Sequence, residues 1–72
     1  MKITDTHDAS SLIDQTIFDD EEQSLIVLFK NSGQSYKYMN FDQSDYQAFE
    51  AASSKGSYFC SNIKPNHPVV KL

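Results

Sequence analysis

The chain has 72 residues, about half the length of a typical domain, so it has room for a single hydrophobic core. Its formal net charge is −4 and all six of its cations are lysine, so it lacks the guanidinium groups that hold phosphate in strong nucleic-acid binders. A single cysteine and two distant histidines exclude a disulfide framework and a zinc site with the usual ligand spacing.

Charge is unevenly distributed along the chain. Residues 1–22 carry a net charge of −6, whereas residues 23–72 carry a net charge of +2. The longest apolar run, residues 25–29, is far shorter than the roughly 20 residues of a membrane-spanning helix, and no signal peptide is recognisable. We therefore expect a cytoplasmic protein without a membrane partner, in which the unpaired cysteine stays reduced.

The first third of the sequence predicts a leader, a strand and a turn. Residues 1–10 contain few apolar side chains, so we expect a flexible leader before a single domain at residues 11–72. Residues 12–18 mix β-branched and polar side chains, which is typical of an edge strand. The four acids at residues 19–22 predict a solvated turn, because they lack the glycine and the alternating oxygen ligands of a calcium loop.

A β-hairpin is expected in the middle of the chain. Residues 25–29 are apolar at every position, which favours a central strand, and the Asn-Ser-Gly sequence that follows suits a tight turn. In the second strand, residues 35–41, the period of two places Tyr36 and Tyr38 on one face. The register is open by one residue, so the tyrosines lie either beside Val27 and Phe29 or beside Ile26 and Leu28.

A helix is expected directly after the hairpin. Asp42 is a good N-cap for a helix at residues 43–54, because its carboxylate can accept hydrogen bonds from the free amides of the first turn. Lys55 and Gly56 are suited to end this helix, as a cation near its C-terminus and a glycine just beyond it.

The end of the sequence completes the expected fold. Ser57 can cap a short second helix at residues 58–63, and residues 69–72 form an extended tail that either pairs with the sheet or wraps across it. The predicted fold class is therefore α+β. It consists of a three-stranded antiparallel β-meander followed by one main α-helix and a short second helix.

Four features together resemble a known family. They are the alternating strand of Leu25, Val27 and Phe29, the triplet Tyr36-Lys37-Tyr38, the helix end at residues 52–59, and the pair Ile63-Lys64. In this order and spacing they resemble the KTSC domain, a small module at the C-terminus of some lysyl-tRNA synthetases that also occurs as free-standing bacterial proteins. The resemblance covers about residues 11–72, and the triplet is similar to the family's tyrosine-x-tyrosine motif.

The resemblance implies three antiparallel strands followed by two helices, and RNA binding suggested by the synthetase context. The sequence departs from the family at two positions, because Cys60 and His67 stand where asparagine and tyrosine are expected. Arginine is also missing from the helices and the tail, which weakens the inference of RNA binding for this chain.

Two groups of residues are candidates for contact with RNA. Tyr36 and Tyr38 could stack on bases, whereas phosphates could be contacted by Lys37, Lys55, Lys64 and Lys71. The segment Lys55-Gly56-Ser57 could also cradle a phosphate in a glycine turn before a helix. Each group has a structural alternative, because tyrosine is a favoured strand residue and a glycine between two helices is an ordinary helix break.

Catalysis is not expected. Cys60 and His67 invite comparison with a thiolate–imidazole dyad, but the sequence offers no third orienting group and no oxyanion element. A cysteine beside Phe59 on a short helix is more typical of a small packed side chain. We therefore expect no enzyme activity, no cofactor and no metal.

The sequence supports two functional hypotheses. The first is weak RNA binding, for example to tRNA, through the tyrosine face and the lysines. The alternative is a protein–protein interaction module or homodimerising domain without nucleic-acid binding, which would use the same tyrosine face or the second apolar face of residues 25–29. RNA binding should weaken steeply with salt, whereas an apolar interface should hardly respond.

Overall fold

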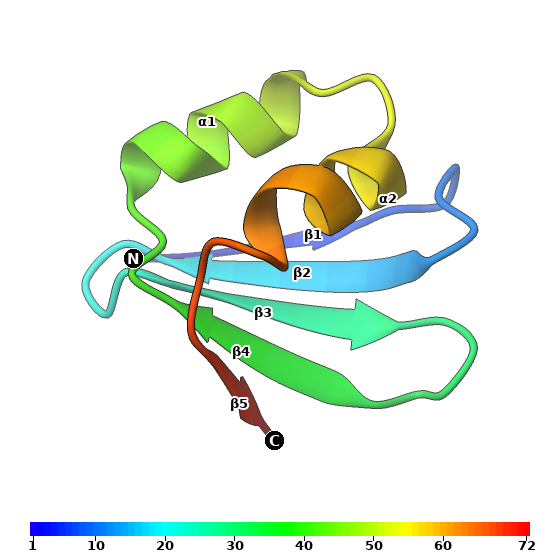
Figure 1. Ribbon diagram of the computed structural model, residues 1–72, viewed down its shortest axis with the longest axis horizontal. Coiled ribbons are helices and arrows are strands. Elements are labelled where there is room, and N and C mark those ends of the chain that lie inside the picture. The colour runs from blue at the N-terminus through cyan, green and yellow to red at the C-terminus, as the bar shows by residue number, and fades with distance from the viewer.

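A computed structural model describes all residues of the protein from Met1 to Leu72. A single antiparallel sheet has the strand order β1-β2-β3-β4-β5. The strands are β1 (Lys2–Thr6), β2 (Ile13–Asp19), β3 (Ser24–Phe29), β4 (Ser35–Met39) and β5 (Val69–Lys71). The helices are α1 (Gln43–Ala51), α2 (Lys55–Tyr58) and η1 (Phe59–Ile63), a turn of π-helix that continues α2. All three lie on one side of the sheet (Figure 1).

The fold class is α+β, as expected, but the prediction of three strands is wrong. Strand β1 forms within the segment expected to be a flexible leader, and the tail forms β5. Strand β2 is consequently an inner strand between β1 and β3 and not an edge strand. The physical reason is that a short segment such as β1 obtains its backbone hydrogen bonds from a neighbouring strand. This long-range pairing cannot be recognised in the composition of the segment itself.

The predicted hairpin is confirmed. Strand β3 is the central strand of the five, and Leu25 and Val27 are fully buried on it. Gly33 adopts a φ of 68° in the turn and its amide donates to the Phe29 carbonyl at 3.0 Å. The positive φ is the reason why glycine suits this position.

The core is one layer between the sheet and the helices. It consists of Ile13, Phe18, Leu25, Val27, Tyr38, Phe41, Phe49, Phe59 and Ile63. Strands β2, β3 and β4 contribute the side chains on the sheet side of this layer. On the helix side, α1 contributes Phe49 and η1 contributes Phe59 and Ile63. No helix of the chain has the length and apolar character needed to cross a bilayer.

The start of the main helix is as predicted. The Asp42 side chain accepts from the Asp45 amide at 2.9 Å, and the Asp45 side chain accepts from the Asp42 amide at 3.1 Å. This reciprocal pair is a capping box, which satisfies two amides that the first turn of a helix leaves free.

The end of the main helix differs from the prediction. Helix α1 ends at Ala51, and both Lys55 and Gly56 belong to α2, which Ser54 caps instead of Ser57. Gly56 has no positive φ, so it is not a C-terminal glycine of α1. A Cβ at Gly56 would lie 3.4 Å from the Leu12 Cβ, because α2 passes close to the β1–β2 loop.

Candidate functional site

The two tyrosines of β4 face the helices. Tyr36 pairs with Val27 and Tyr38 pairs with Leu25, which decides the register that the sequence left open. Tyr38 is only 5% exposed, and its ring packs edge-on against Phe59 at a centroid distance of 5.1 Å. The predicted pair of stacking platforms is therefore absent, because Tyr38 is a core residue with no open ring face.

Tyr36 differs from Tyr38 because it lies at the rim of the core. It is half-buried, its ring packs edge-on against Phe29 at 5.7 Å, and its hydroxyl donates to the Gln34 side chain at 2.9 Å. Tyr36 is thus the tyrosine of the predicted pair that retains contact with solvent.

An apolar groove opens beside Tyr36, where η1 leaves part of the sheet uncovered. Its volume is about 470 Å³, and its lining comprises Leu12, Phe29, Tyr36, Tyr38, Phe59, Cys60, Lys64 and Val69. Lys64 is the one charged side chain of this set. We call this space the aromatic groove. A concave apolar surface with few polar groups is the usual form of a binding site in a small domain.

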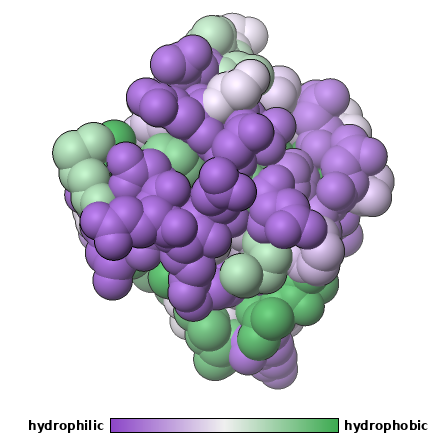
Figure 2. Space-filling model, turned by 90° about the vertical axis from the view of Figure 1, so that its left-hand side faces the viewer, coloured by the Kyte–Doolittle hydropathy of each residue, from purple (hydrophilic) through white to green (hydrophobic).

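Strand β5 forms the edge of the sheet and contributes Val69 to the lining of the aromatic groove. It pairs with β4 alone, and its side chains are unusually exposed for apolar residues: Val69 and Val70 are each 52% exposed, and Leu72 just beyond the strand is 60% exposed. Figure 2 shows mostly hydrophilic surface, with hydrophobic atoms gathered at the lower end, the level at which β5 lies in Figure 1. An apolar edge strand of this kind is available for pairing.

The predicted phosphate-contacting lysines do not form one surface. Lys37 lies on the face of β4 opposite the tyrosines, where its ammonium pairs with the Glu22 carboxylate at 2.6 Å. This hydrogen bond, together with a second from Ser24, lowers the pKa of Glu22. Lys64 lines the aromatic groove and Lys71 lies opposite Tyr36 on β5, so these two are the candidate lysines that the fold brings to the tyrosine side.

The segment Lys55-Gly56-Ser57 lies apart from the tyrosines. It lines a second hollow of about 820 Å³, between α2 and the β1–β2 loop, whose walls are mostly polar. The Lys55 ammonium donates to the carbonyls of Glu50 at 2.9 Å and Ala52 at 2.6 Å. Lys55 therefore supplies the expected cation at the end of α1, where the carbonyls of Glu50 and Ala52 occupy its ammonium group.

Cys60 and His67 serve different parts of the fold. Cys60 is exposed on η1, between the aromatic groove and the polar hollow. The His67 Nδ1 is 3.0 Å from the Met39 carbonyl, and its ring packs on Phe41 at 5.3 Å. His67 thus attaches the start of β5 to the end of β4.

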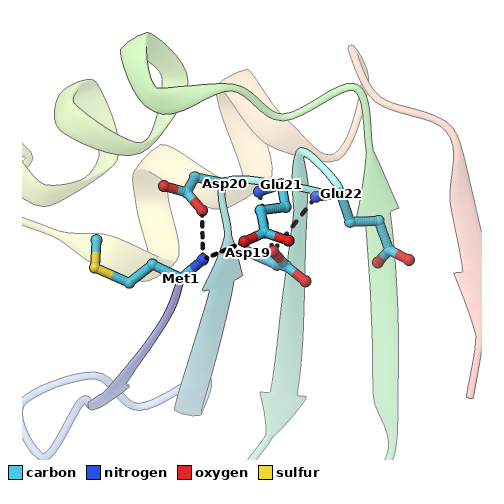
Figure 3. Close-up of polar contacts among 5 residues, drawn as sticks. All are labelled: Met1, Asp19, Asp20, Glu21 and Glu22. Carbon is cyan, nitrogen blue, oxygen red and sulfur yellow. Dashed lines mark hydrogen bonds and ion pairs between the residues drawn. The ribbon is translucent and has the colours of Figure 1, made fainter.

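The acidic residues 19–22 comprise the last residue of β2 and the first three residues of the turn to β3 (Figure 3). The Asp19 carboxylate accepts from the amides of Glu21 at 3.0 Å and Glu22 at 3.3 Å, which shapes the turn. The amino group of Met1 lies 2.8 Å from an Asp20 oxygen and 3.4 Å from a Glu21 oxygen. The turn is exposed as predicted, but its carboxylates have partners within the chain.

The pattern that defines the KTSC domain family matches residues 9–67. The chain belongs to the KTSC domain family. The crystal structure of a KTSC domain protein from Yersinia pestis is similar to it, with a TM-score of 0.88 and 26% sequence identity over 100% of this chain and 99% of the other. No curated protein matches the sequence. The resemblance seen in the sequence is therefore confirmed for the family and for the α+β class of fold, whereas the three strands that it implied are five.

Two features of this KTSC domain were not foreseen from its sequence. One is the exposure of the apolar side chains at β5, because the sequence left open whether residues 69–72 pair with the sheet or wrap across it, and the structure shows that they pair. The other is His7, which is 8% exposed and whose Nε2 lies 2.7 Å from the Thr16 hydroxyl. Burial lowers the pKa of His7. Its position between two polar neighbours in the sequence does not suggest a core residue.

Proposed function

We propose that this KTSC domain is a protein-interaction module that binds an extended segment of a partner chain along the outer edge of β5. The observation that carries the proposal is the exposed apolar edge strand beside the aromatic groove. Addition of a strand to an open sheet edge is a recurring mode of peptide recognition, in which main-chain hydrogen bonds supply affinity and neighbouring pockets supply specificity.

The electrostatics of the tyrosine side favour a protein over RNA. Tyr38 is buried and Lys37 is paired on the opposite face, which leaves Tyr36 with Lys64 and Lys71 as possible contacts for a strand of RNA. Two lysines release few counterions, so affinity for RNA would be low in a chain of net charge −4. RNA binding at this same surface remains the second candidate because these two lysines lie next to a half-exposed tyrosine.

The proposal is tested by selecting peptides from a displayed random library against the labelled chain. Val69→Pro removes an outward-facing amide that a sixth strand would need, whereas Val70→Thr keeps every backbone donor and provides the control. We expect selected peptides to bind the parent and Val70→Thr, and to lose most of their affinity for Val69→Pro. Peptides that bind Val69→Pro equally well, or a library without any binder, would contradict the proposal.

A titration with mixed tRNA at low and at raised salt tests the second candidate. Amide shifts at Tyr36, Lys64 and Lys71 that disappear at raised salt would favour RNA as the ligand of this surface. No shift at low salt, where charge attraction is strongest, would exclude it. A partner that is a second copy of the chain would instead reveal itself as a concentration-dependent mass in sedimentation.

A further inference from the structure

We propose that the β5 edge selects extended segments in which an acidic residue is followed by two apolar residues. This inference rests on the proposed function and names the chemistry of the partner. It follows from three observations: which backbone groups of β5 are free, which side chains lie on each face, and where the unpaired positive charges lie.

The free backbone groups are set by the pairing of β5 with β4. The Met39 amide donates to the Pro68 carbonyl at 2.8 Å, and the Leu72 amide donates to the Ser35 carbonyl at 3.0 Å. Because inward and outward groups alternate in an antiparallel ladder, the amides and carbonyls of Val69 and Lys71 point away from β4. A peptide strand can therefore form hydrogen bonds with the main chain of these two residues.

The side chains of β5 define three positions on such a peptide. Val69 lies opposite Tyr38 and Lys71 lies opposite Tyr36, so both are on the helix side of the sheet. Val70 lies opposite Lys37 and projects to the other face. The peptide residue beside Val69 thus lies at the aromatic groove, and the one beside Val70 extends an exposed apolar surface, so both positions favour apolar side chains.

The position beside Lys71 favours an acid. The ammonium groups of Lys64 and Lys71 take part in no ion pair or hydrogen bond within the chain, whereas Lys37 is neutralised by Glu22. An opposite charge directly across a strand pair is stabilising and a like charge is destabilising. In an antiparallel peptide, the arrangement of every other strand pair in this sheet, the residue beside Lys71 precedes the two apolar ones.

The preference for an acidic residue and two apolar residues is tested with three end-blocked peptides of equal length that carry Glu-Val-Val, Lys-Val-Val or Glu-Ser-Ser in the same threonine-rich frame. Each peptide is titrated into the full-length isotope-labelled chain, and the amide shifts of Val69, Val70, Lys71 and Lys64 are followed. We expect the Glu-Val-Val peptide to bind about two- to five-fold more tightly than the Lys-Val-Val peptide, and the Glu-Ser-Ser peptide to bind most weakly.

Charge reversal on the protein provides the decisive comparison. Lys71→Glu should invert the preference, so that the Lys-Val-Val peptide binds more tightly than the Glu-Val-Val peptide. Lys2→Glu changes the net charge equally on β1, at the opposite edge of the sheet, and should leave the preference unchanged. An inversion by both variants would mean that only net charge matters, and the inference would be wrong.

The remaining outcomes separate the inference from the function on which it rests. If all three peptides shift the β5 amides with equal affinity, strand addition stands and the acidic–apolar selectivity is overturned. If no peptide shifts these amides, both the selectivity and the proposed interaction edge are overturned for segments of this kind.

Discussion

His7 is a buried histidine that makes folding dependent on pH. Its pKa is lowered mainly by burial, against an opposing effect of the nearby Asp5 carboxylate and with smaller lowering effects of Lys55 and Lys30. The unfolded chain therefore takes up a proton at His7 at higher pH than the folded chain does. The stabilisation is complete above the unfolded value near pH 6.5, and it is lost as the pH falls below that value.

The His7→Gln variant tests this dependence. Wild-type stability in urea should fall between pH 7.5 and pH 5.5, and the variant should show a shallower fall while losing about 1 kcal/mol at pH 7.5 through the altered bond to Thr16. His67→Gln is the matched control, because it also replaces a histidine but leaves His7 in place. Equal slopes for wild type and His7→Gln would show that another group is responsible.

Two carboxylates, Asp5 on β1 and Glu50 on α1, lie close enough to interact. The pKa of Glu50 is raised, first by the partial desolvation of its otherwise exposed carboxylate and then by Asp5, while Asp5 also accepts a hydrogen bond of 2.7 Å from the Tyr46 hydroxyl. Burial of the Tyr46 hydroxyl and its hydrogen bond to Asp5 also raise the pKa of Tyr46. A raised carboxyl pKa means that the folded chain binds the proton more tightly, so this stabilisation is lost as the pH rises through the folded value.

Removing one of these charges should stabilise the protein at neutral pH. We expect Glu50→Gln to raise the free energy of unfolding at pH 7 by up to about 0.5 kcal/mol, a modest figure because the side chain is largely exposed. The gain should vanish near pH 4, where Glu50 is protonated. Thermal unfolding at both pH values measures this, and Asp8→Asn controls for net charge. A gain that persists at pH 4 would refute the repulsion.

At the scale of elements, β1 is an integral strand although its composition suggests a leader. Ile3 packs against the core while Lys2 is exposed. Ile3→Ala should therefore cost about 1 kcal/mol of stability and accelerate amide exchange in β1, whereas Lys2→Ala should have little effect. Denaturant titration and hydrogen exchange distinguish the cases. A flexible leader would make the two variants indistinguishable from wild type.

The two glycines offer a second comparison at this scale. Gly33→Ala should cost about 1 kcal/mol, because alanine resists the φ of 68° in the hairpin turn. Gly56→Ala should cost nothing or stabilise α2, since its φ is negative and the new Cβ would meet Leu12 Cβ at an ordinary contact of 3.4 Å. Thermal unfolding measures both changes. A larger loss of stability for Gly56→Ala than for Gly33→Ala would contradict a helical Gly56 in α2.

At the scale of the whole molecule, one core serves all elements. The radius of gyration is 10.9 Å, close to the roughly 11 Å expected for a compact chain of this length. We expect a single cooperative unfolding transition in which circular dichroism and tyrosine fluorescence coincide. Two separate transitions would show that the β1 side and the β5 side unfold independently.

Features encoded by neighbouring residues could be predicted from the sequence. The central strand, the glycine turn after it and the N-cap at Asp42 each depend on side chains a few positions apart, so their patterns are visible without the fold. The family resemblance was predictable for the same reason, because it consists of such local patterns in a given order.

Only the tertiary structure decided which surfaces are open. The pairing register turned the tyrosine face of β4 toward the helices and so buried Tyr38, and the folding of the tail brought Lys64 and Lys71 to that same side. Register and strand addition depend on contacts between residues far apart in the chain, and a shift by one residue would have moved both tyrosines to the other face. The sequence by itself thus determined the class of fold, whereas long-range pairing determined the exposed β5 edge on which the proposed function depends.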